Sequence, residues 1–214
     1  HLGLPKVAST YLQRDIFPNL QNAHFYKKHK FRKYKTIDSA QLEAHTIFSS
    51  EMDRGLEDTL DHILSLHPEA RVILLIRSHE DWVLSRYKYH LRKFGSYSLE
   101  EFLDLDNNQG HWKTEELLFS KKIEYIHEEC KHKPLILNYD LLKQDRASFL
   151  KLLTNYLGCN LEQGTSTSSV RNRSFNKKQL ILLRRFNKSY PYIEKKTSSK
   201  ILNKLHYRYR QYLL

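Results

Sequence analysis

A short segment near the start of the chain carries residue types that bind phosphate groups. Gly3, Lys6, Ser9 and Thr10 lie in HLGLPKVAST, where an apolar stretch gives way to a polar one. Backbone N–H groups at the start of a helix bind anions, and lysine and hydroxyl side chains add further donors. In the ATP-binding motif G-x-x-x-x-G-K-[ST], the lysine directly precedes the hydroxyl residue. Here the lysine stands three positions earlier, so the segment predicts a loop for a different phosphate-bearing ligand.

Two further candidate residues end apolar segments elsewhere in the chain. The run RVILLIR, residues 71–77, is typical of a strand buried on both faces of a parallel sheet, and it ends at Arg77. The segment HTIFSSE, residues 45–51, predicts a short strand followed by a polar turn that ends at Glu51. Ligands of open parallel sheets bind at the carboxyl ends of the strands. We therefore expect Lys6, Glu51 and Arg77 to come together at one edge.

The elements that must position these residues alternate between strands and helices. Apolar residues at helical spacing predict helices, and short β-branched or leucine runs predict strands. The expected strands cover 45–51, 71–77 and 134–140, and the expected helices cover 9–17, 56–66, 79–94, 114–130, 146–157, 176–188 and 197–212. This alternation predicts one α/β domain over residues 1–214, with a central parallel sheet flanked by helices.

Two of these segments together resemble the sulfotransferases that use 3′-phosphoadenosine 5′-phosphosulfate (PAPS). The first loop resembles that family's 5′-phosphosulfate loop, P-K-[ST]-G-[ST]-[ST]-x-L. It matches at Pro5, Lys6, Ser9, Thr10 and Leu12 and departs from it at Val7 and Ala8. Ala8 stands where the family usually has glycine, so its backbone must keep a negative φ or accept strain. RVILLIRSHEDWVLSRY resembles the second motif, in which an arginine ends a strand and a serine follows eight residues later.

The resemblance implies a P-loop-like fold of the bacterial or carbohydrate type and a role for each matched residue. The loop would bind the 5′-phosphosulfate through Pro5, Lys6, Val7, Ala8, Ser9, Thr10 and Tyr11, with the backbone N–H groups of residues 7–11 facing the phosphate. Lys6 would stabilise the charge that develops on the oxygen between sulfur and phosphorus. The 3′-phosphate would bind Arg77 and Ser85. A basic loop would return over the 3′-phosphate or the adenine, with Arg173 as the first candidate for this contact and Arg171 as the second.

The remaining expectations concern the acceptor and its proton. Glu51 is the first candidate for the general base, and His45 and His24 are weaker ones. We expect no metal in the reaction, since sulfuryl transfer places less charge on the moving group than phosphoryl transfer does. The acceptor is expected to be a hydroxyl compound, with a carbohydrate as the first choice; lipids and small molecules stay open.

Composition leaves two other function classes open. The net charge of +12 predicts an anionic partner without choosing between a phosphorylated cosubstrate and a nucleic acid. The alternatives are a P-loop nucleotide kinase or other phosphotransferase, which would need Mg²⁺, and a basic nucleic-acid-binding protein. We expect neither a transmembrane segment nor nucleic-acid binding, because no apolar run nears about 20 residues and no nucleic-acid-binding motif is present. Two cysteines favour a cytoplasmic location; a Golgi location stays open because the chain begins at His1.

Overall fold

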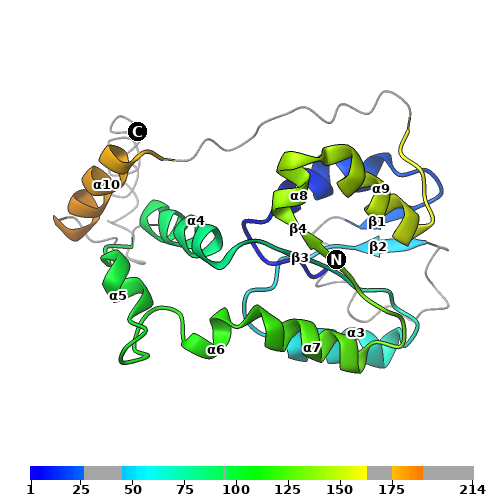
Figure 1. The fold of residues 1–214 in the computed structure, drawn as a ribbon, viewed down its shortest axis with the longest axis horizontal. Coiled ribbons are helices and arrows are strands. Elements are labelled where there is room, and N and C mark those ends of the chain that lie inside the picture. The colour runs from blue at the N-terminus through cyan, green and yellow to red at the C-terminus, as the bar shows by residue number, and fades with distance from the viewer. Residues whose placement is uncertain (27–44, 94, 163–174, 190–214) are drawn as a thin grey trace, which may run out of the picture. The chain divides into compact units, whose positions relative to one another are not determined.

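The computed structural model describes residues 1–26, 45–93, 95–162 and 175–189 (Figure 1). These residues fall into two compact units. The first combines His1–His79 with Leu118–Ser169, and the second combines Glu80–Leu117 with Val170–Leu214. The expected helix 197–212 lies outside the described residues. One domain over residues 1–214 stays a prediction.

The first unit contains two pairs of short parallel strands. β1 (His24–Tyr26) pairs with β2 (Thr46–Phe48), and β3 (Ile73–Ile76) pairs with β4 (Leu135–Asn138). The parallel strands expected from the sequence are thus confirmed, although they are short. β1 was not expected, because its three residues offer too little pattern to detect.

The segment 1–4 links the two strand pairs through backbone hydrogen bonds. The N–H group of Ser50, just beyond β2, donates to the carbonyl of His1 at 2.9 Å. On its other side the segment donates to β3, from Leu2 to Ile73 at 3.0 Å and from Leu4 to Leu75 at 3.3 Å. The segment therefore lies between β2 and β3, which places the loop that follows it at the carboxyl ends of both strands.

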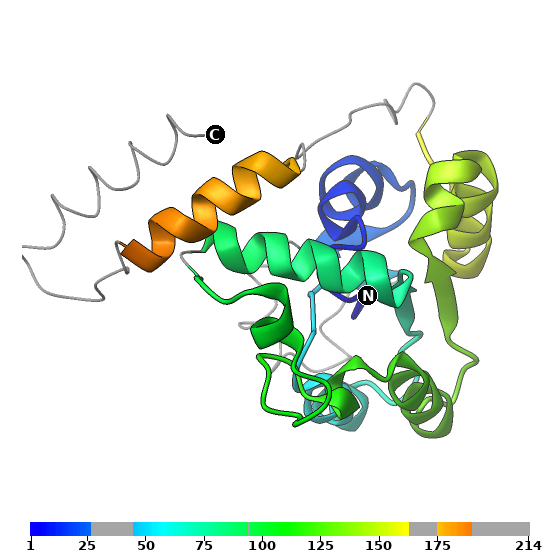
Figure 2. The same ribbon diagram turned by 60° about the vertical axis from the view of Figure 1, so that its left-hand side comes forward.

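Helices cover both sides of β3 and β4 (Figures 1 and 2). α3 (Leu56–Leu66) and α7 (Phe119–Glu129) contact each other on one side, and α8 (Tyr139–Gln144) and α9 (Arg146–Leu157) lie on the other. An apolar core lies between the strands and the first helix pair, since apolar residues at helical spacing give each helix one apolar face. Its buried members are Leu2, Leu56, Leu60, Val72, Leu74, Ile126 and Cys130.

Two of the expected helices differ in the structure. The run expected over 114–130 is divided into α6 (Thr114–Leu117) and α7, because the backbone at Leu118 leaves the helical region (φ −77°, ψ 88°). The helix expected over 9–17 begins as α1 (Ser9–Tyr11) and continues as a π-helix, η1 (Leu12–Ile16), and a 3₁₀ turn, η2 (Phe17–Asn19). In both cases apolar burial outweighs regular local geometry: Phe119, Leu12 and Ile16 are all buried.

The second unit is built from helices. It contains α4 (His79–Arg92), α5 (Leu99–Leu103), α6 and α10 (Lys177–Ser189), and its buried side chains include Trp82, Trp112 and Phe102. Ser98 and Glu101 form a capping box at the start of α5. The buried Asn187 side chain of α10 donates to the carbonyls of Leu91 at 2.8 Å and Gly95 at 2.6 Å, so it fixes the end of α4.

Neither membrane-spanning helices nor disulfides occur in the part of the chain that the structure describes. None of its helices has the length and apolar character needed to cross a membrane. Cys130 and Cys159 are both free and buried.

Candidate active site

The loop between the first segment and α1 is turned by two residues in the left-handed backbone region. Lys6 has a φ of 71° and Ala8 a φ of 70°, and neither is glycine. Ala8, which stands where the family usually has glycine, therefore adopts a strained positive φ and not a negative one. A left-handed residue with a Cβ costs about 1–2 kcal/mol. Backbone strain of this kind clusters at functional sites, so the loop is a candidate ligand clamp.

The start of α1 is well ordered by its own contacts. Val7 and Ser9 are buried, and the Ser9 hydroxyl donates to the Leu4 carbonyl at 3.3 Å. The N–H groups of Tyr11 and Leu12 donate to the Ala8 carbonyl at 2.9 and 3.1 Å. The Tyr11 N–H group is therefore already engaged, and the N–H groups of residues 7–10 precede the first helical hydrogen bond.

The Tyr11 side chain carries a hydroxyl group that could donate a hydrogen bond to a ligand, whereas the Tyr11 N–H group is already engaged. Its hydroxyl is buried and has no hydrogen-bond partner among the described residues. The Arg146 guanidinium lies 5.9 Å from the centre of the Tyr11 ring. Burial raises the pKa of Tyr11, and this effect is opposed by Arg146 and reinforced by Asp15. The hydroxyl is thus a neutral donor beside a cation, which suits an anionic ligand.

Glu51 follows β2 at the same strand edge as the loop. The two serines before it are buried, and Ser49 accepts a hydrogen bond from Gln13 of η1 at 2.9 Å. His1 Nδ1 lies 2.7 Å from the same serine oxygen. These contacts connect the end of β2 to both the segment before the loop and the helical run after it. Glu51, which is half-buried, is therefore held on a fixed turn.

The two histidines considered as alternative bases lie at the other end of the β1–β2 pair. His24 is the first residue of β1, and His45 directly precedes β2. The His24 N–H group donates to the His45 carbonyl at 3.2 Å, and both side chains are exposed. Since the two strands are parallel, both histidines lie at the amino ends, away from the edge that carries Glu51.

Arg77 follows β3 and contacts the residue that follows β4. Its guanidinium lies 4.8 Å from the centre of the Tyr139 ring, and the Lys143 ammonium lies 4.9 Å from the same ring. Such cation–π contacts hold a guanidinium in one orientation while leaving its N–H groups able to donate. Tyr139 thus positions Arg77 at the strand edge.

The remaining predicted site residues lie elsewhere. Ser85 is half-buried on α4 in the second unit, whereas Arg77 belongs to the first. Arg173 and Arg171 lie outside the described residues. Within the described ranges no group of three or more His, Cys, Asp or Glu side chains could hold a metal ion.

Sequence reasoning missed Tyr139 and Gln13. Tyr139 carried a usable signal, because it follows a strand in the same way as Arg77 does. Gln13 carried none, since its role depends on η1 packing beside the end of β2.

Comparisons with known proteins identify the family and a similar fold. The sulfotransferase-domain family model matches residues 8–213. The crystal structure of mouse sulfotransferase SULT7A1 complexed with PAP, 3′-phosphoadenosine 5′-phosphate, is similar in fold, with a TM-score of 0.51 and 16% sequence identity. The match covers 86% of this chain and 61% of the mouse chain. No curated protein matches in sequence. Because the family model spans nearly the whole chain, the chain belongs to the sulfotransferase-domain family.

Proposed function

We propose that the chain transfers a sulfuryl group from PAPS to an acceptor hydroxyl. The observation that carries this proposal is the Lys6–Ala8 loop, which lies between the carboxyl ends of β2 and β3 next to the segments that carry Glu51 and Arg77. Family membership supports a sulfotransferase over a nucleotide kinase. When bound, PAPS supplies an activated sulfuryl group whose leaving group is PAP.

The loop would hold the 5′-phosphosulfate. The donors that fit an anion there are the backbone N–H groups of residues 7–10, the Thr10 hydroxyl and the Tyr11 hydroxyl, which has no hydrogen-bond partner among the described residues. Pro5 is buried and fixes the entry of the loop. The left-handed turn at Ala8 replaces the family glycine without removing the backbone donors, so the departure from the motif does not argue against the ligand.

Lys6 would act on the bond that breaks. Its half-buried side chain starts from a left-handed backbone position at the strand edge. An ammonium that donates to the bridging oxygen is favoured most when charge builds up there, so it stabilises the transition state more than the ground state. Lys6 is therefore proposed as a catalytic residue.

Arg77 and Ser85 would hold the 3′-phosphate, with Arg173 as a further donor. Tyr139 keeps the Arg77 guanidinium in a fixed orientation, which reduces the cost of forming paired hydrogen bonds to phosphate oxygens.

Glu51 is proposed to take the acceptor proton, since the alternative histidines lie at the amino ends of β1 and β2. The proposed acceptor class is a carbohydrate hydroxyl, and no metal takes part.

Turnover of labelled PAPS tests this function. A panel of carbohydrate, lipid and phenolic hydroxyl compounds is incubated with PAPS carrying ³⁵S, and transferred label is counted for the protein and for Lys6→Ala. We expect label on at least one acceptor and a loss of roughly 10²–10³-fold in Lys6→Ala, the size seen when one transition-state donor is removed. Equal turnover of the two proteins with a confirmed acceptor would refute the role of Lys6.

A further inference from the structure

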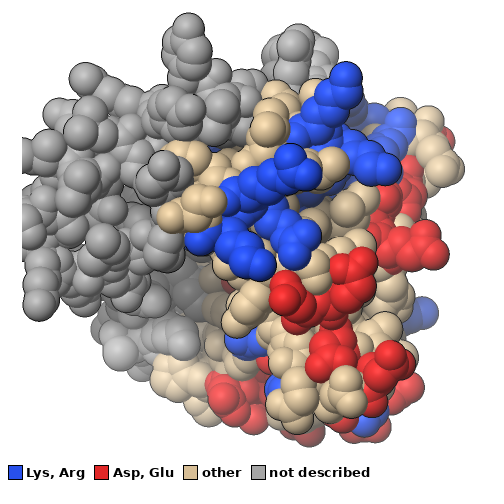
Figure 3. Space-filling view, turned by 90° about the vertical axis from the view of Figure 1, so that its left-hand side faces the viewer, with Lys and Arg blue, Asp and Glu red and all other residues tan. Residues whose placement is uncertain are grey.

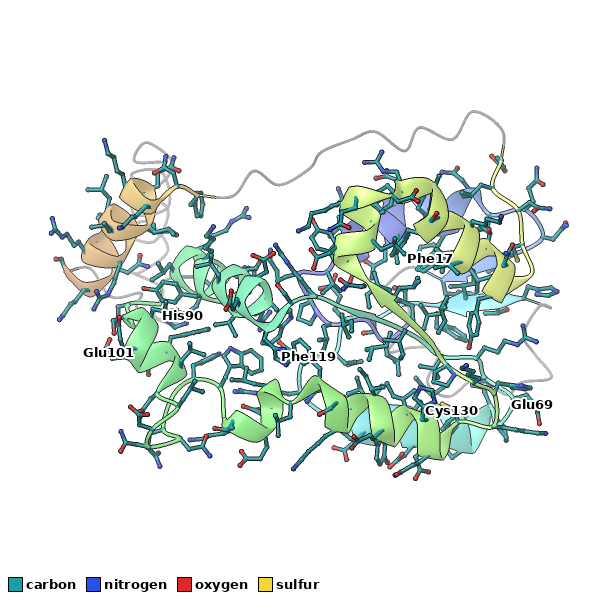
Figure 4. The ribbon with its side chains drawn as sticks, in the orientation of Figure 1. Phe17, Glu69, His90, Glu101, Phe119 and Cys130 are labelled. Atoms are coloured by element: carbon teal, nitrogen blue, oxygen red, sulfur yellow. The ribbon has the colours of Figure 1, made fainter. Side chains whose placement is uncertain are left out.

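The second unit contains a small cavity whose walls combine cations and aromatic rings. Its volume is about 160 Å³, and it is formed by side chains of α4 and of the residue after it, of α5 and of the segment that follows α5. Figure 4 labels one wall residue, His90 of α4. The described residues that line it are Arg86, Tyr89, His90, Lys93, Phe102 and His111.

The cavity carries positive charge with no acidic residue in its described lining. Arg86 and Lys93 are both charged at neutral pH, and no carboxylate is among the six lining residues. On the face drawn in Figure 3, most of the visible Lys and Arg gather in one area, and Asp and Glu predominate beside it with a few Lys or Arg among them. Burial, together with the neighbouring His111, lowers the pKa of His90 to about 4. His90 is therefore neutral and contributes a ring face rather than a charge.

The aromatic walls of the cavity are rigidly packed. The His111 ring stacks on Phe102 with centroids 5.1 Å apart and 13° between the planes. The His90 ring stacks on Tyr97 at 5.2 Å and contacts Phe102 at 5.1 Å. An engineered cavity of about 150 Å³ in another protein accepts benzene. The space therefore has the size of one six-membered ring, and four of its six lining residues are aromatic.

Arg86 connects the cavity to the tryptophans of the unit. Its guanidinium lies 5.1 Å from the centre of the Trp112 ring and 5.8 Å from that of Trp82. The two indoles pack edge to face at 5.0 Å and are both buried. These are the only two tryptophans in the sequence. A ligand that pairs with Arg86 would change the electrostatic surroundings of both.

We propose that this cavity is a binding site for a single six-membered ring that carries one carboxylate or sulfate group. Arg86 and Lys93 would pair with the anionic group, and the aromatic rings would stack on the ring of the ligand. An aromatic acid and a uronic-acid sugar share this chemistry. The site is assigned independently of sulfuryl transfer, because none of its six residues has a role in the proposed reaction.

Tryptophan fluorescence titrations of the full chain, excited at 295 nm, test this proposal. The anionic ring probes are benzoate and glucuronate, the neutral ring controls are benzyl alcohol and glucose, and acetate is the anion without a ring. We expect saturable binding of at least one anionic ring, at least about tenfold tighter than its neutral counterpart and than acetate, because a hydrogen bond to a charged group contributes that much. Benzoate binding alone would identify an aromatic acid site, and glucuronate binding alone would identify a sugar-acid site.

Three variants separate the proposed contacts from general charge effects. Arg86→Gln should weaken the anionic probe about tenfold or more, and Lys93→Gln, whose side chain is exposed, should weaken it about two- to fivefold. Arg92→Gln changes a neighbouring exposed cation of α4 outside the cavity lining and should leave the affinity unchanged. If Arg86→Gln does not fold, Lys93→Gln still tests the site.

Several outcomes would overturn the assignment. One is the absence of both a fluorescence change and a melting-temperature shift with either anionic ring up to 20 mM. Another is equal binding of the charged and neutral rings. A third is an equal loss of affinity in Lys93→Gln and Arg92→Gln. Each of these results leaves the sulfuryl-transfer proposal untouched, since that is tested by turnover of PAPS.

Discussion

Replacing Ala8 by glycine should stabilise the protein, although alanine-to-glycine changes usually destabilise. Ala8 has φ 70° and ψ 18°, directly before the first residue of α1. Relief of the left-handed strain is worth about 1–2 kcal/mol. Glycine also makes the unfolded chain more flexible, which lowers the gain in the free energy of unfolding by about 0.4–1 kcal/mol. We therefore expect Ala8→Gly to raise the free energy of unfolding by about 0.5–1 kcal/mol.

The assay is urea denaturation, with thermal unfolding as a second readout. For a chain of this length the expected gain corresponds to a rise of about 1–4 °C in the melting temperature. Ala147→Gly is the control: Ala147 is exposed in the first turn of α9, and its replacement should cost up to about 0.5–1 kcal/mol, the cost of glycine in a helix interior. A loss of stability in Ala8→Gly as large as that in Ala147→Gly would refute the left-handed conformation and the strain argument that depends on it.

Three further predictions address the site and the second unit. Arg77→Ala should reduce the affinity for PAP, measured by calorimetry, by about tenfold or more, and Ser85→Ala should reduce it by less. The affinity for the analogue without the 3′-phosphate should stay the same in both variants. An equal loss of affinity for both ligands would contradict the assignment. Glu51→Gln should lower turnover by about 10²-fold or more and flatten the acidic limb of the pH–rate profile, while PAP binding stays unchanged. If the variant keeps both the turnover rate and the acidic limb, Glu51 is not the general base. The half-buried His90 has a pKa of about 4 in the folded state against 6.5 in the unfolded chain, so between these values the unfolded chain binds the extra proton. The free energy of unfolding should therefore fall as pH drops from 7.5 to 5, by about 1 kcal/mol after allowance for partial exposure, and His90→Phe should flatten this dependence in urea titrations; an unchanged slope would place the titrating group elsewhere.

The strands and helices that bury long apolar stretches could be predicted from the sequence. α3 and α9 begin and end where the leucine spacing and Gly158 indicate. β3 and β4 lie within their expected runs because continuous apolar residues leave little choice of register. β1 and α8 could not be predicted, since three and six residues give no readable period, and their existence depends on the neighbours they pack against.

The sequence predicts which strand ends form the candidate site, and it does not predict which side chains contact each other there. The rule that ligands bind at the carboxyl ends of parallel strands brings the Lys6 loop, Glu51 and Arg77 to one edge, and the hydrogen bonds of segment 1–4 agree with it. The cation–π contact between Arg77 and Tyr139 and the burial of the Tyr11 hydroxyl depend on side-chain packing between distant segments. No local pattern encodes such contacts.

The central claim is that this loop and strand edge bind PAPS rather than a nucleoside triphosphate or a nucleic acid. Thermal unfolding in the presence of PAP, ATP with Mg²⁺, or a single-stranded oligonucleotide tests it most directly. At a free PAP concentration 100 times Kd, binding adds about 2.7 kcal/mol, which corresponds to a rise of about 5–11 °C in the melting temperature of a chain of this length. We predict this rise with PAP and a much smaller one with the other two ligands. Stabilisation by ATP with Mg²⁺ or by the oligonucleotide, with none by PAP, would contradict the proposed function.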